Sequence, residues 1–433
     1  MKDNYILFWH RRDLRLEDNI GLHHALTSGK KVIPIFIFDN DILDKLPKND
    51  ARVNFIHDEL SKIHSTLQDH GSSLIVKHGK PLVVLQEIIS TFNISAVYTN
   101  HDYEPYAIAR DTEVKEFLET QNIEFKTFKD QVIFERNEIV KADGKPYTVY
   151  TPFSKKWLAN LKDTDYQSVD SQIHYSNFAK VSTNLPTLED IGFTPSKIKV
   201  LPYAITENII DNYEDTRNFP AIEGTSRLSP HLRFGTISVR KCIQHGLRSE
   251  NNIFLKELIW REFFMQILWH FPTSVTHNFK SKYDGVKWRN NEEDYKAWCE
   301  GKTGYPLVDA GMRELNKSGY MHNRVRMITA SFLCKHLLID WKWGEAYFAK
   351  KLLDFDLAQN VGNWQWVAGT GCDSSPYFRI FNPTSQIQKF DKDHGYIKKW
   401  ASDYQEFTYP KPIIDHKFAR ERCLEVYKAG INA

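Results

Sequence analysis

The chain has 433 residues, of which 41% are hydrophobic and 26% are charged. This composition is typical of a folded protein of two or three domains, and it excludes disordered, collagen-like and coiled-coil chains. The 57 Lys and Arg residues nearly balance the 55 Asp and Glu residues, so a nucleic-acid site must be a local patch. Nine of the eleven tryptophans lie after residue 250, which a uniform demand for core residues does not explain.

Cysteine usage and the N-terminal sequence indicate a cellular compartment. The five cysteines are widely spaced, and no two have the spacing of metal ligands, so we expect a reduced, cytoplasmic protein without a metal site. Residues 1–4 lead directly into an apolar segment and carry no signal-peptide pattern. No apolar run approaches the roughly 18 to 20 residues of a membrane span, so we expect no membrane association.

The first 130 residues alternate short apolar segments with amphipathic ones. The predicted strands are residues 5–9, 31–38, 73–77, 96–99 and 124–128, and the predicted helices are residues 51–70, 82–92 and 106–120. The continuously apolar run 32–38 is typical of a strand buried on both faces of a parallel sheet. We therefore predict a doubly wound α/β domain whose ligand sites lie in the loops after Trp9, Phe38 and Thr99. No G-x-G-x-x-G sequence follows any of these strands, which argues against an ordinary NAD site.

The spacing of apolar residues changes twice after residue 130. Residues 131–205 show no regular apolar spacing and contain five of the prolines. This predicts an interdomain connector that runs over the surface. From residue 206 to 433 apolar residues recur at spacings of three and four, without strand signals, which predicts an all-α domain. Its clearest helical patterns are residues 253–271, 307–315, 324–338 and 345–353.

Two short motifs in the helical part are candidates for binding a phosphorylated ligand. Residues 224–230 combine a glycine, three hydroxyls and Arg227 just before a helical stretch; this suits a phosphate site and equally a capped helix start. Asp354 and Asp356 are separated by Phe355. Such carboxylates can bind a ribose hydroxyl, or they can pair structurally with an arginine such as Arg326.

Other motifs combine aromatic and polar side chains on one helix face. Glu257, Trp260 and Arg261 are spaced i, i+3 and i+4, so they share one face of a helix. Residues 323–327 place an amide, a cation and a thioether in the same way, and residues 360–366 contain two tryptophans separated by one residue. Such faces can stack on nucleobases or on a flavin ring, and ordinary surface pairs and core packing would produce the same patterns.

These segments together resemble the photolyase/cryptochrome family, and they occur in the family's order along the chain. The blocks that carry the resemblance are residues 8–16, 224–230, 260–263, 303–310, 321–324, 338–341 and 379–383. The resemblance implies an N-terminal α/β domain that binds an antenna chromophore and a C-terminal helical domain that binds FAD. It is closest to the class I photolyases, which are carbon-carbon lyases that use light to repair cyclobutane pyrimidine dimers in DNA.

The resemblance also implies roles for individual residues. In the lesion pocket, Glu257 hydrogen-bonds the dimer, Trp260 and Trp366 form an apolar clamp, and Asn323 and Met327 line the wall. The implied electron relay to the flavin consists of Trp288, Trp341 and Trp364. The implied FAD contacts are Tyr213, Thr225, Ser226, Arg227, Leu228, Ser229, Arg326, Asp354, Phe355, Asp356 and Asn360, the last facing flavin N5. The implied DNA contacts are Arg217, Glu257, Trp260, Arg261, Asn323, Arg324, Arg379, Gln386 and Lys389.

The implied mechanism is electron donation from excited, fully reduced FAD (FADH⁻) to a dimer flipped out of UV-damaged DNA, independently of sequence. Photolyases for the 6-4 lesion typically have histidines at Asn323 and Met327, and DASH cryptochromes usually have Gln at Met327. Plant and animal cryptochromes usually replace Asn360 with Asp and Cys, respectively. A 6-4 photolyase and a light-sensing cryptochrome are therefore the less favoured alternatives, and we expect a monomeric repair enzyme.

One short segment bears on the type of antenna chromophore. Residues 102–106 look like those of deazaflavin-binding members, whereas folate-binding members often carry Asn-Glu in place of Tyr106 and Ala107. The resemblance therefore favours 8-hydroxy-5-deazaflavin over methenyltetrahydrofolate.

Overall fold

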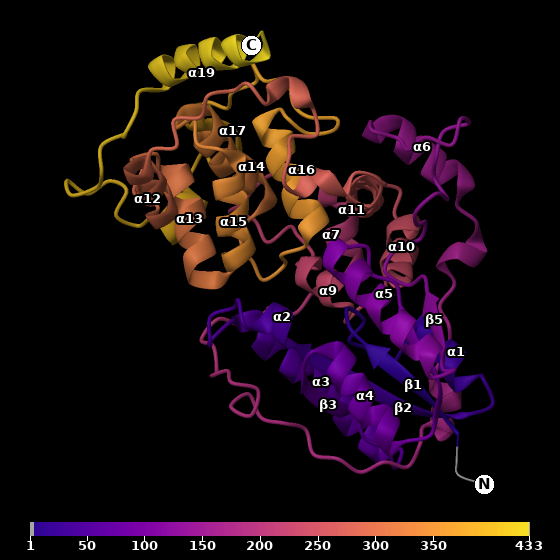
Figure 1. The fold of residues 1–433 in the computed structure, drawn as a ribbon. Coiled ribbons are helices and arrows are strands. Elements are labelled where there is room, and N and C mark those ends of the chain that lie inside the picture. Colours follow the sequence, from indigo (N-terminus) through magenta and orange to yellow (C-terminus); the bar gives the residue numbers. More distant parts are fainter. Residues whose placement is uncertain (1–3, 433) are drawn as a thin grey trace. The chain divides into compact units, whose positions relative to one another are not determined.

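The computed structural model describes residues 4–432, which form two compact units (Figure 1). Unit 1 contains the residues up to 135 together with 160–203 and 227–248. Unit 2 contains residues 136–159, 204–226 and 249 to the C-terminal end. Between residues 135 and 249 the chain therefore passes from one unit to the other several times.

Unit 1 is built around a five-stranded parallel sheet of order β3-β2-β1-β4-β5. Its strands are β1 (Tyr5–His10), β2 (Lys31–Asp39), β3 (Ile75–Gly79), β4 (Ile94–Asn100) and β5 (Glu124–Phe128). Every residue of β2 after Lys31 is buried, as its continuous apolar sequence predicts. The predicted α/β fold class and all five predicted strands are confirmed.

Helices cover both faces of this sheet (Figure 1). The helical segments of unit 1 are α1 (Ile20–Leu26), α2 (Asn40–Leu43), α3 (Ala51–Asp69), α4 (Pro81–Thr91), α5 (Pro105–Thr120), α9 (Ser229–Phe234), α10 (Val239–Arg248) and the 3₁₀ turns η1 (Asp163–Tyr166) and η2 (Gln172–Asn177). Apolar side chains of α1 and α3 form one core with the sheet, and those of α4 and α5 form another. Local sequence sets the helix starts, because Asp50 caps α3 and prolines occupy the first positions of α4 and α5.

The predicted surface connector is partly wrong. Residues Tyr150–Asn160 form helix α6, and its Tyr150, Phe153 and Trp157 are buried in unit 2. Further along, Phe178 is buried and forms a β-bridge with Val32 in unit 1. The i, i+3, i+7 spacing of the three aromatic residues is helical, but the neighbouring prolines obscure so short a pattern.

Unit 2 is helical, as predicted, and no strand occurs among its described residues. Its helices are α7 (Glu207–Asp211), α8 (Tyr213–Thr216), α11 (Ile253–His270), α12 (Glu292–Glu300), α13 (Pro306–Ser318), α14 (Asn323–Ser331), α15 (Trp341–Lys351), α16 (Leu357–Ala368), α17 (Pro383–Phe390), α18 (Gly395–Trp400) and α19 (His416–Ile431), with short turns η3 (Pro272–Val275), η4 (Ser281–Tyr283) and the π-helix η5 (Phe332–His336). Helix α15 begins before the predicted residue 345 because Asp340 caps it by accepting from the Lys342 N–H. Within residues 4–432, no helix is both long and apolar enough to cross a membrane.

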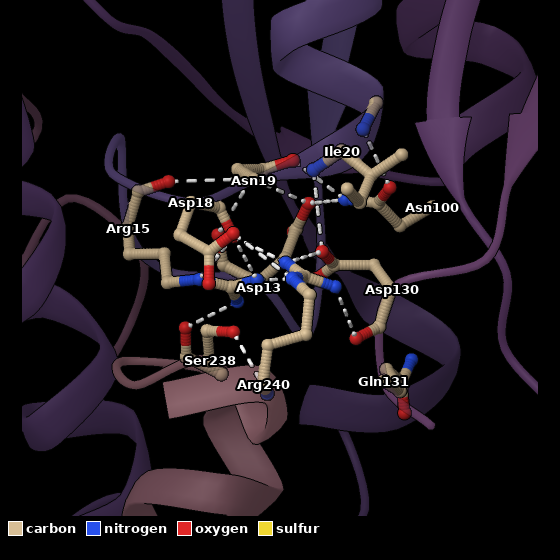
Figure 2. A network of polar contacts seen from close by, with 12 residues as sticks. Asp13, Arg15, Asp18, Asn19, Ile20, Asn100, Asp130, Gln131, Ser238 and Arg240 are labelled. Atoms are coloured by element: carbon tan, nitrogen blue, oxygen red, sulfur yellow. Dashed lines mark hydrogen bonds and ion pairs between the residues drawn. The ribbon is translucent and has the colours of Figure 1, made fainter. Parts of the chain in front are cut away.

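A buried ion network joins three segments of unit 1 (Figure 2). Asp130, in the loop after β5, accepts hydrogen bonds from Arg15 at 2.6 Å and from Arg240 of α10 at 2.8 Å. Arg240 also pairs with Asp18 at 2.9 Å. Burial opposes ionisation of Asp130, but the two guanidinium groups outweigh it and lower the pKa of this carboxyl to about 2.

We expect Asp130→Asn to destabilise unit 1 by about 3 to 5 kcal/mol at pH 7, because it leaves two buried arginines without their shared anion. The pKa of Asp130 is lower in the folded than in the unfolded chain, so its contribution is complete above the unfolded value of about 4 and is lost as the pH falls toward 2. Urea unfolding at pH 7 and at pH 3 measures both effects. Replacing the exposed Asp44 with Asn is the control. If Asp130→Asn lowered the free energy of unfolding no more than this control does, Asp130 would not be the buried anion that the two arginines require.

Candidate functional site

The predicted Glu257 face is present on α11. Glu257, Trp260 and Arg261 are all half-buried, and the Glu257 carboxylate accepts a charge-assisted hydrogen bond from the Arg217 guanidinium, just beyond α8. The side chains of Arg217 and Glu257 are 29% and 36% exposed, and a pair so open to solvent adds little to stability. The carboxylate and the guanidinium are therefore accessible to an incoming ligand.

The indole of Trp260 is stacked on the ring of Tyr150 from α6. The ring centroids are 3.7 Å apart and the planes differ by 5°. The Tyr150 hydroxyl donates to the Lys256 carbonyl of α11 at 2.8 Å. Tyr150 was not among the residues predicted from the sequence, although its place at the start of an aromatic i, i+3, i+7 pattern could have indicated a helix that packs against another element.

The other predicted pocket residues lie on α14 and α16. Asn323 is exposed at the first position of α14, and Met327 is half-buried one turn later. Trp366 of α16 is half-buried and packs against the core of unit 2. Helix α16 packs against both α11 and α14, so one helix bundle holds all five predicted pocket residues.

Three of the predicted DNA-binding arginines influence one another electrostatically. Burial, with the nearby charges of Arg217 and Arg379, lowers the pKa of Arg324. The Arg324 guanidinium lies 4.3 Å from the ring centroid of Phe390 in α17 and donates to Asn218 at 2.5 Å. Cations that converge in this way form a local positive patch on a chain whose net charge is only +2.

The remaining predicted DNA contacts lie on α17 and α11. Gln386 is half-buried and Lys389 is exposed, both on α17, and the Lys389 ammonium lies 5.3 Å from the Phe390 ring centroid. On α11, the Arg261 carbonyl accepts from the Gln359 side chain at 2.7 Å. The exposed Lys389 extends the positive surface along α17.

An ion pair lies at the centre of the predicted FAD residues. Arg326 of α14 donates two hydrogen bonds to Asp354, at 3.2 and 2.8 Å, and the Asp354 side chain is only 4% exposed. Burial acts against the Arg326 charge, but Asp354 outweighs it and raises the pKa of Arg326. The Arg326 guanidinium also lies 5.7 Å from the ring centroid of Tyr320, and Thr225 is half-buried. Arg326 thus contacts both an aromatic ring and the Asp354 carboxylate.

The start of α16 presents two further predicted FAD residues. Asp356 caps the helix by accepting from the Ala358 N–H at 3.2 Å. One turn later the Asn360 amide donates to Glu345 of α15, at 2.7 Å to the carboxylate and at 3.1 Å to the backbone carbonyl. Burial raises the pKa of Glu345. Glu345 thus fixes the orientation of Asn360, a role that was not predicted from the sequence.

The other predicted FAD residues are divided between the two units. Tyr213, at the start of α8, packs edge-on against Phe254, and Phe355 is half-buried against the core of unit 2. Ser226 is buried in unit 2. In unit 1, Arg227 has a left-handed backbone with a φ of 54°, Leu228 is buried, and Ser229 begins α9.

The predicted relay tryptophans all belong to unit 2. Trp364 is buried, and its ring centroid lies 5.0 Å from that of Phe348. Helix α15 leaves space for this indole through Gly344, where a Cβ atom would come within 2.1 Å of the Trp364 ring. Trp341 is buried and its indole donates to Asn278 at 2.9 Å, whereas Trp288 is half-buried. The structure thus places one indole near the surface and two inside the core.

In unit 1, the predicted loops meet at the carboxyl edge of the sheet. Arg11 and Arg110 lie 5.1 and 4.9 Å from the ring centroid of Trp9. The Tyr106 hydroxyl donates to Asp39, at the end of β2, at 2.6 Å. Burial and this carboxylate raise the pKa of Tyr106. The loops after Trp9, Phe38 and Thr99 therefore form one polar and aromatic site, as predicted from the parallel sheet.

Comparison with known proteins identifies the family. Residues 6–171 match the DNA photolyase family, and residues 254–408 match the FAD binding domain of DNA photolyase. The deoxyribodipyrimidine photo-lyase of Synechococcus is 37% identical over 98% of this chain and 96% of the relative, and that of Escherichia coli is 36% identical over 98% of each. The crystal structure of a class III photolyase from Agrobacterium tumefaciens is 36% identical and has a TM-score of 0.90 over 100% of this chain and 99% of its own. This chain belongs to the photolyase/cryptochrome family.

Proposed function

We propose that the chain is a deoxyribodipyrimidine photo-lyase that uses light and bound FAD to split cyclobutane pyrimidine dimers in DNA. The observation that carries the proposal is the pairing of Arg217 with Glu257 on the Trp260 face, with Arg324 hydrogen-bonded to the adjacent Asn218. This arrangement lies in the helical unit that matches the FAD binding domain of DNA photolyase. Relatives at 33 to 37% identity over nearly the full chain carry the same enzyme name.

The residues of unit 2 fit a flavin dinucleotide. FAD, in its fully reduced form, supplies the electron that opens the cyclobutane ring under light. Arg326 and Asp354 offer a cation and a buried carboxylate, which suit phosphate and hydroxyl groups of a dinucleotide. Asn360, oriented by Glu345, presents an amide for hydrogen bonding to the ring edge at N5. The further proposed contacts are Tyr213, Thr225, Ser226, Arg227, Leu228, Ser229, Phe355 and Asp356.

The proposed lesion pocket receives a dimer that has left the base stack. A dimer pairs and stacks poorly, so its extrusion costs less than that of an intact base. Glu257 hydrogen-bonds the dimer edge, and Trp260 and Trp366 pack against its apolar surface. Asn323 and Met327 line the wall. The remaining proposed DNA contacts are Arg217, Arg261, Arg324, Arg379, Gln386 and Lys389. They position the DNA strand mainly through its phosphates, so they do not depend on the base sequence.

A repair assay tests this function directly. The purified protein, with its FAD reduced, is mixed with an oligonucleotide that contains one thymine dimer and is then illuminated. We expect absorbance of the intact thymines to recover with light and to stay constant in the dark. Absence of recovery from a protein that retains reduced FAD would refute the proposal.

We expect Glu257→Ala to lower the yield of repair roughly 3- to 10-fold, the range of one lost hydrogen bond, and to leave FAD bound. Glu257 lies on the Trp260 face and contacts Arg217, whereas the proposed FAD residues Arg326, Asp354 and Asn360 lie on or beside other helices. Repair per absorbed photon and the flavin-to-protein absorbance ratio are the measurements. The control is Glu293→Ala on the exposed part of α12, and an unchanged yield in Glu257→Ala would remove Glu257 from the mechanism.

We further propose an antenna site at the carboxyl edge of the sheet in unit 1. The aromatic Trp9 and Tyr106, with the cations Arg11 and Arg110, suit a flat, anionic chromophore. The sequence of residues 102–106 favours 8-hydroxy-5-deazaflavin over methenyltetrahydrofolate. An archaeal photolyase from Sulfolobus tokodaii, 33% identical with a TM-score of 0.83 over 98% of this chain and 99% of its own, is described with two FAD molecules, which imply a novel light-harvesting cofactor. Absorption spectra of the protein before and after denaturation distinguish 8-hydroxy-5-deazaflavin, methenyltetrahydrofolate and a second FAD.

We also propose a cellular compartment, an oligomeric state and a DNA partner for the enzyme. We place it in the cytoplasm, as a monomer that acts on UV-damaged DNA irrespective of sequence. The five reduced cysteines and the phosphate-directed cations support this setting.

A further inference from the structure

Tyr150 lies outside every sequence block that carries the family resemblance, yet it contacts the centre of the proposed lesion pocket. Its ring covers one face of the Trp260 indole at 3.7 Å, nearly parallel to it. On another side the Trp260 ring meets Phe264 at 5.6 Å. The indole itself stays half-buried. Trp260 is therefore fixed by protein on one face while part of it is open to a ligand.

Tyr150 is held rigidly in this position. Its side chain is 9% exposed, and its hydroxyl donates to the Lys256 carbonyl on the same helix that carries Trp260. The next turns of α6 also contact α11. The ring centroids of Phe153 and Phe263 are 5.2 Å apart, and the Trp157 indole N–H donates to the Glu262 carboxylate at 2.6 Å.

Tyr150 also connects the indole to other parts of the site. Its backbone N–H donates to the Asp373 carboxylate at 3.0 Å, in the segment that leads to Arg379, and Asp373 has a left-handed backbone with a φ of 44°. Burial, and then the charge of Glu257, raises the pKa of Tyr150. The phenol is therefore neutral and close to the Glu257 carboxylate.

We infer that Tyr150 is a positioning residue for damage recognition: it holds the Trp260 ring in the plane that receives the flipped-out dimer. This inference rests on the proposed function. An indole that is already ordered loses less conformational entropy when it packs against a ligand, and an aromatic stack of this kind stabilises the ring beyond the effect of area burial. Without the stack, Trp260 has to be ordered by the dimer itself.

The test compares Tyr150→Leu, which removes the stack, with Tyr150→Phe, which keeps it and removes only the hydroxyl. Binding is measured in the dark with an oligonucleotide that contains one thymine dimer and with the same oligonucleotide undamaged. We expect Tyr150→Leu to weaken binding of the damaged strand roughly 3- to 10-fold, in keeping with the stacking energy, and to leave binding of the undamaged strand unchanged. Tyr150→Phe should bind both strands like the wild type.

Two further variants separate positioning from a general structural role. Phe153→Leu alters the same interface of α6 with α11 without touching Trp260, and should leave the preference for the damaged strand intact. In the Trp260→Ala background, Tyr150→Leu should cause no further loss, because the ring that it positions is absent. Additive losses in that background, or an equal loss in Phe153→Leu, would overturn the inference.

The wild-type measurement tests the proposed function separately. A wild-type protein that binds damaged and undamaged strands equally would contradict the proposed function and this inference with it. A wild-type preference that survives in Tyr150→Leu would overturn the inference alone.

Discussion

Replacing Asp354 with Ala is expected to release FAD from unit 2 and to lower its free energy of unfolding by about 3 kcal/mol, because it leaves the Arg326 charge largely buried and unpaired. Arg326 donates two hydrogen bonds to Asp354, and Asp354 is almost inaccessible to solvent. The Arg326 side chain is 24% exposed, so partial hydration places the cost at the lower end of the range for buried pairs. The flavin-to-protein absorbance ratio and urea unfolding measure the two effects.

Two comparisons define what Asp354 contributes. Asp354→Asn preserves the shape of the side chain and removes its charge, so we expect it to retain more FAD than Asp354→Ala. Glu300→Ala removes a carboxylate from an exposed pair with Lys302 and should leave both measurements unchanged. If Asp354→Ala bound FAD fully and unfolded like the wild type, the pair would have neither the structural nor the binding role assigned to it.

Replacing Trp364 with Phe is expected to slow light-driven reduction of bound, oxidised FAD at least about tenfold, equivalent to about 1.4 kcal/mol or more in the barrier. Trp364 is buried on α16, one turn after Asn360, and a phenyl ring gives up an electron far less readily than an indole. The smaller ring still fits beside Gly344, where the indole already leaves no space for a Cβ. Flash photolysis in the presence of an external reductant measures the rate.

Trp400→Phe on α18 is the matched control, because Trp400 packs at the edge of the same core and has no proposed part in electron transfer. The repair yield of Trp364→Phe, measured after chemical reduction of its FAD, should equal that of the wild type. Equal photoreduction rates in Trp364→Phe and the wild type would exclude Trp364 from the relay.

The sequence predicted the elements of unit 1 well because their signals are local. A run such as residues 32–38 is apolar at every position, and only a strand covered on both faces buries all of it. The amphipathic segments that form α3, α4 and α5 are long enough to identify as helices, whereas the short α1 and α2 were not predicted. Helix α6 was missed because its three buried aromatic residues span only eight positions, which include Pro152. Its stability comes from packing against α11 rather than from its own sequence.

For the site, residue spacing predicted which side chains share a helix face, and only the family resemblance suggested what they bind. Glu257 and Trp260 share a face of α11, as their spacing requires. Spacing gave no indication that Arg217, 40 residues away, pairs with Glu257, or that Tyr150 covers Trp260. The partner of Asn360 was missed for the same reason, since Glu345 comes from a different helix.

The amino-acid sequence by itself determined the α/β and helical architecture, the family and the candidate residues, since these depend on local periodicity and on motifs in a given order. Only the tertiary structure decided which of those residues touch: Arg217 with Glu257, Tyr150 with Trp260, Glu345 with Asn360. The physical reason is that such contacts join segments far apart in the chain, and their geometry depends on how helices pack rather than on any local pattern. The orientation of Trp260, which we connect with damage recognition, is set in this way.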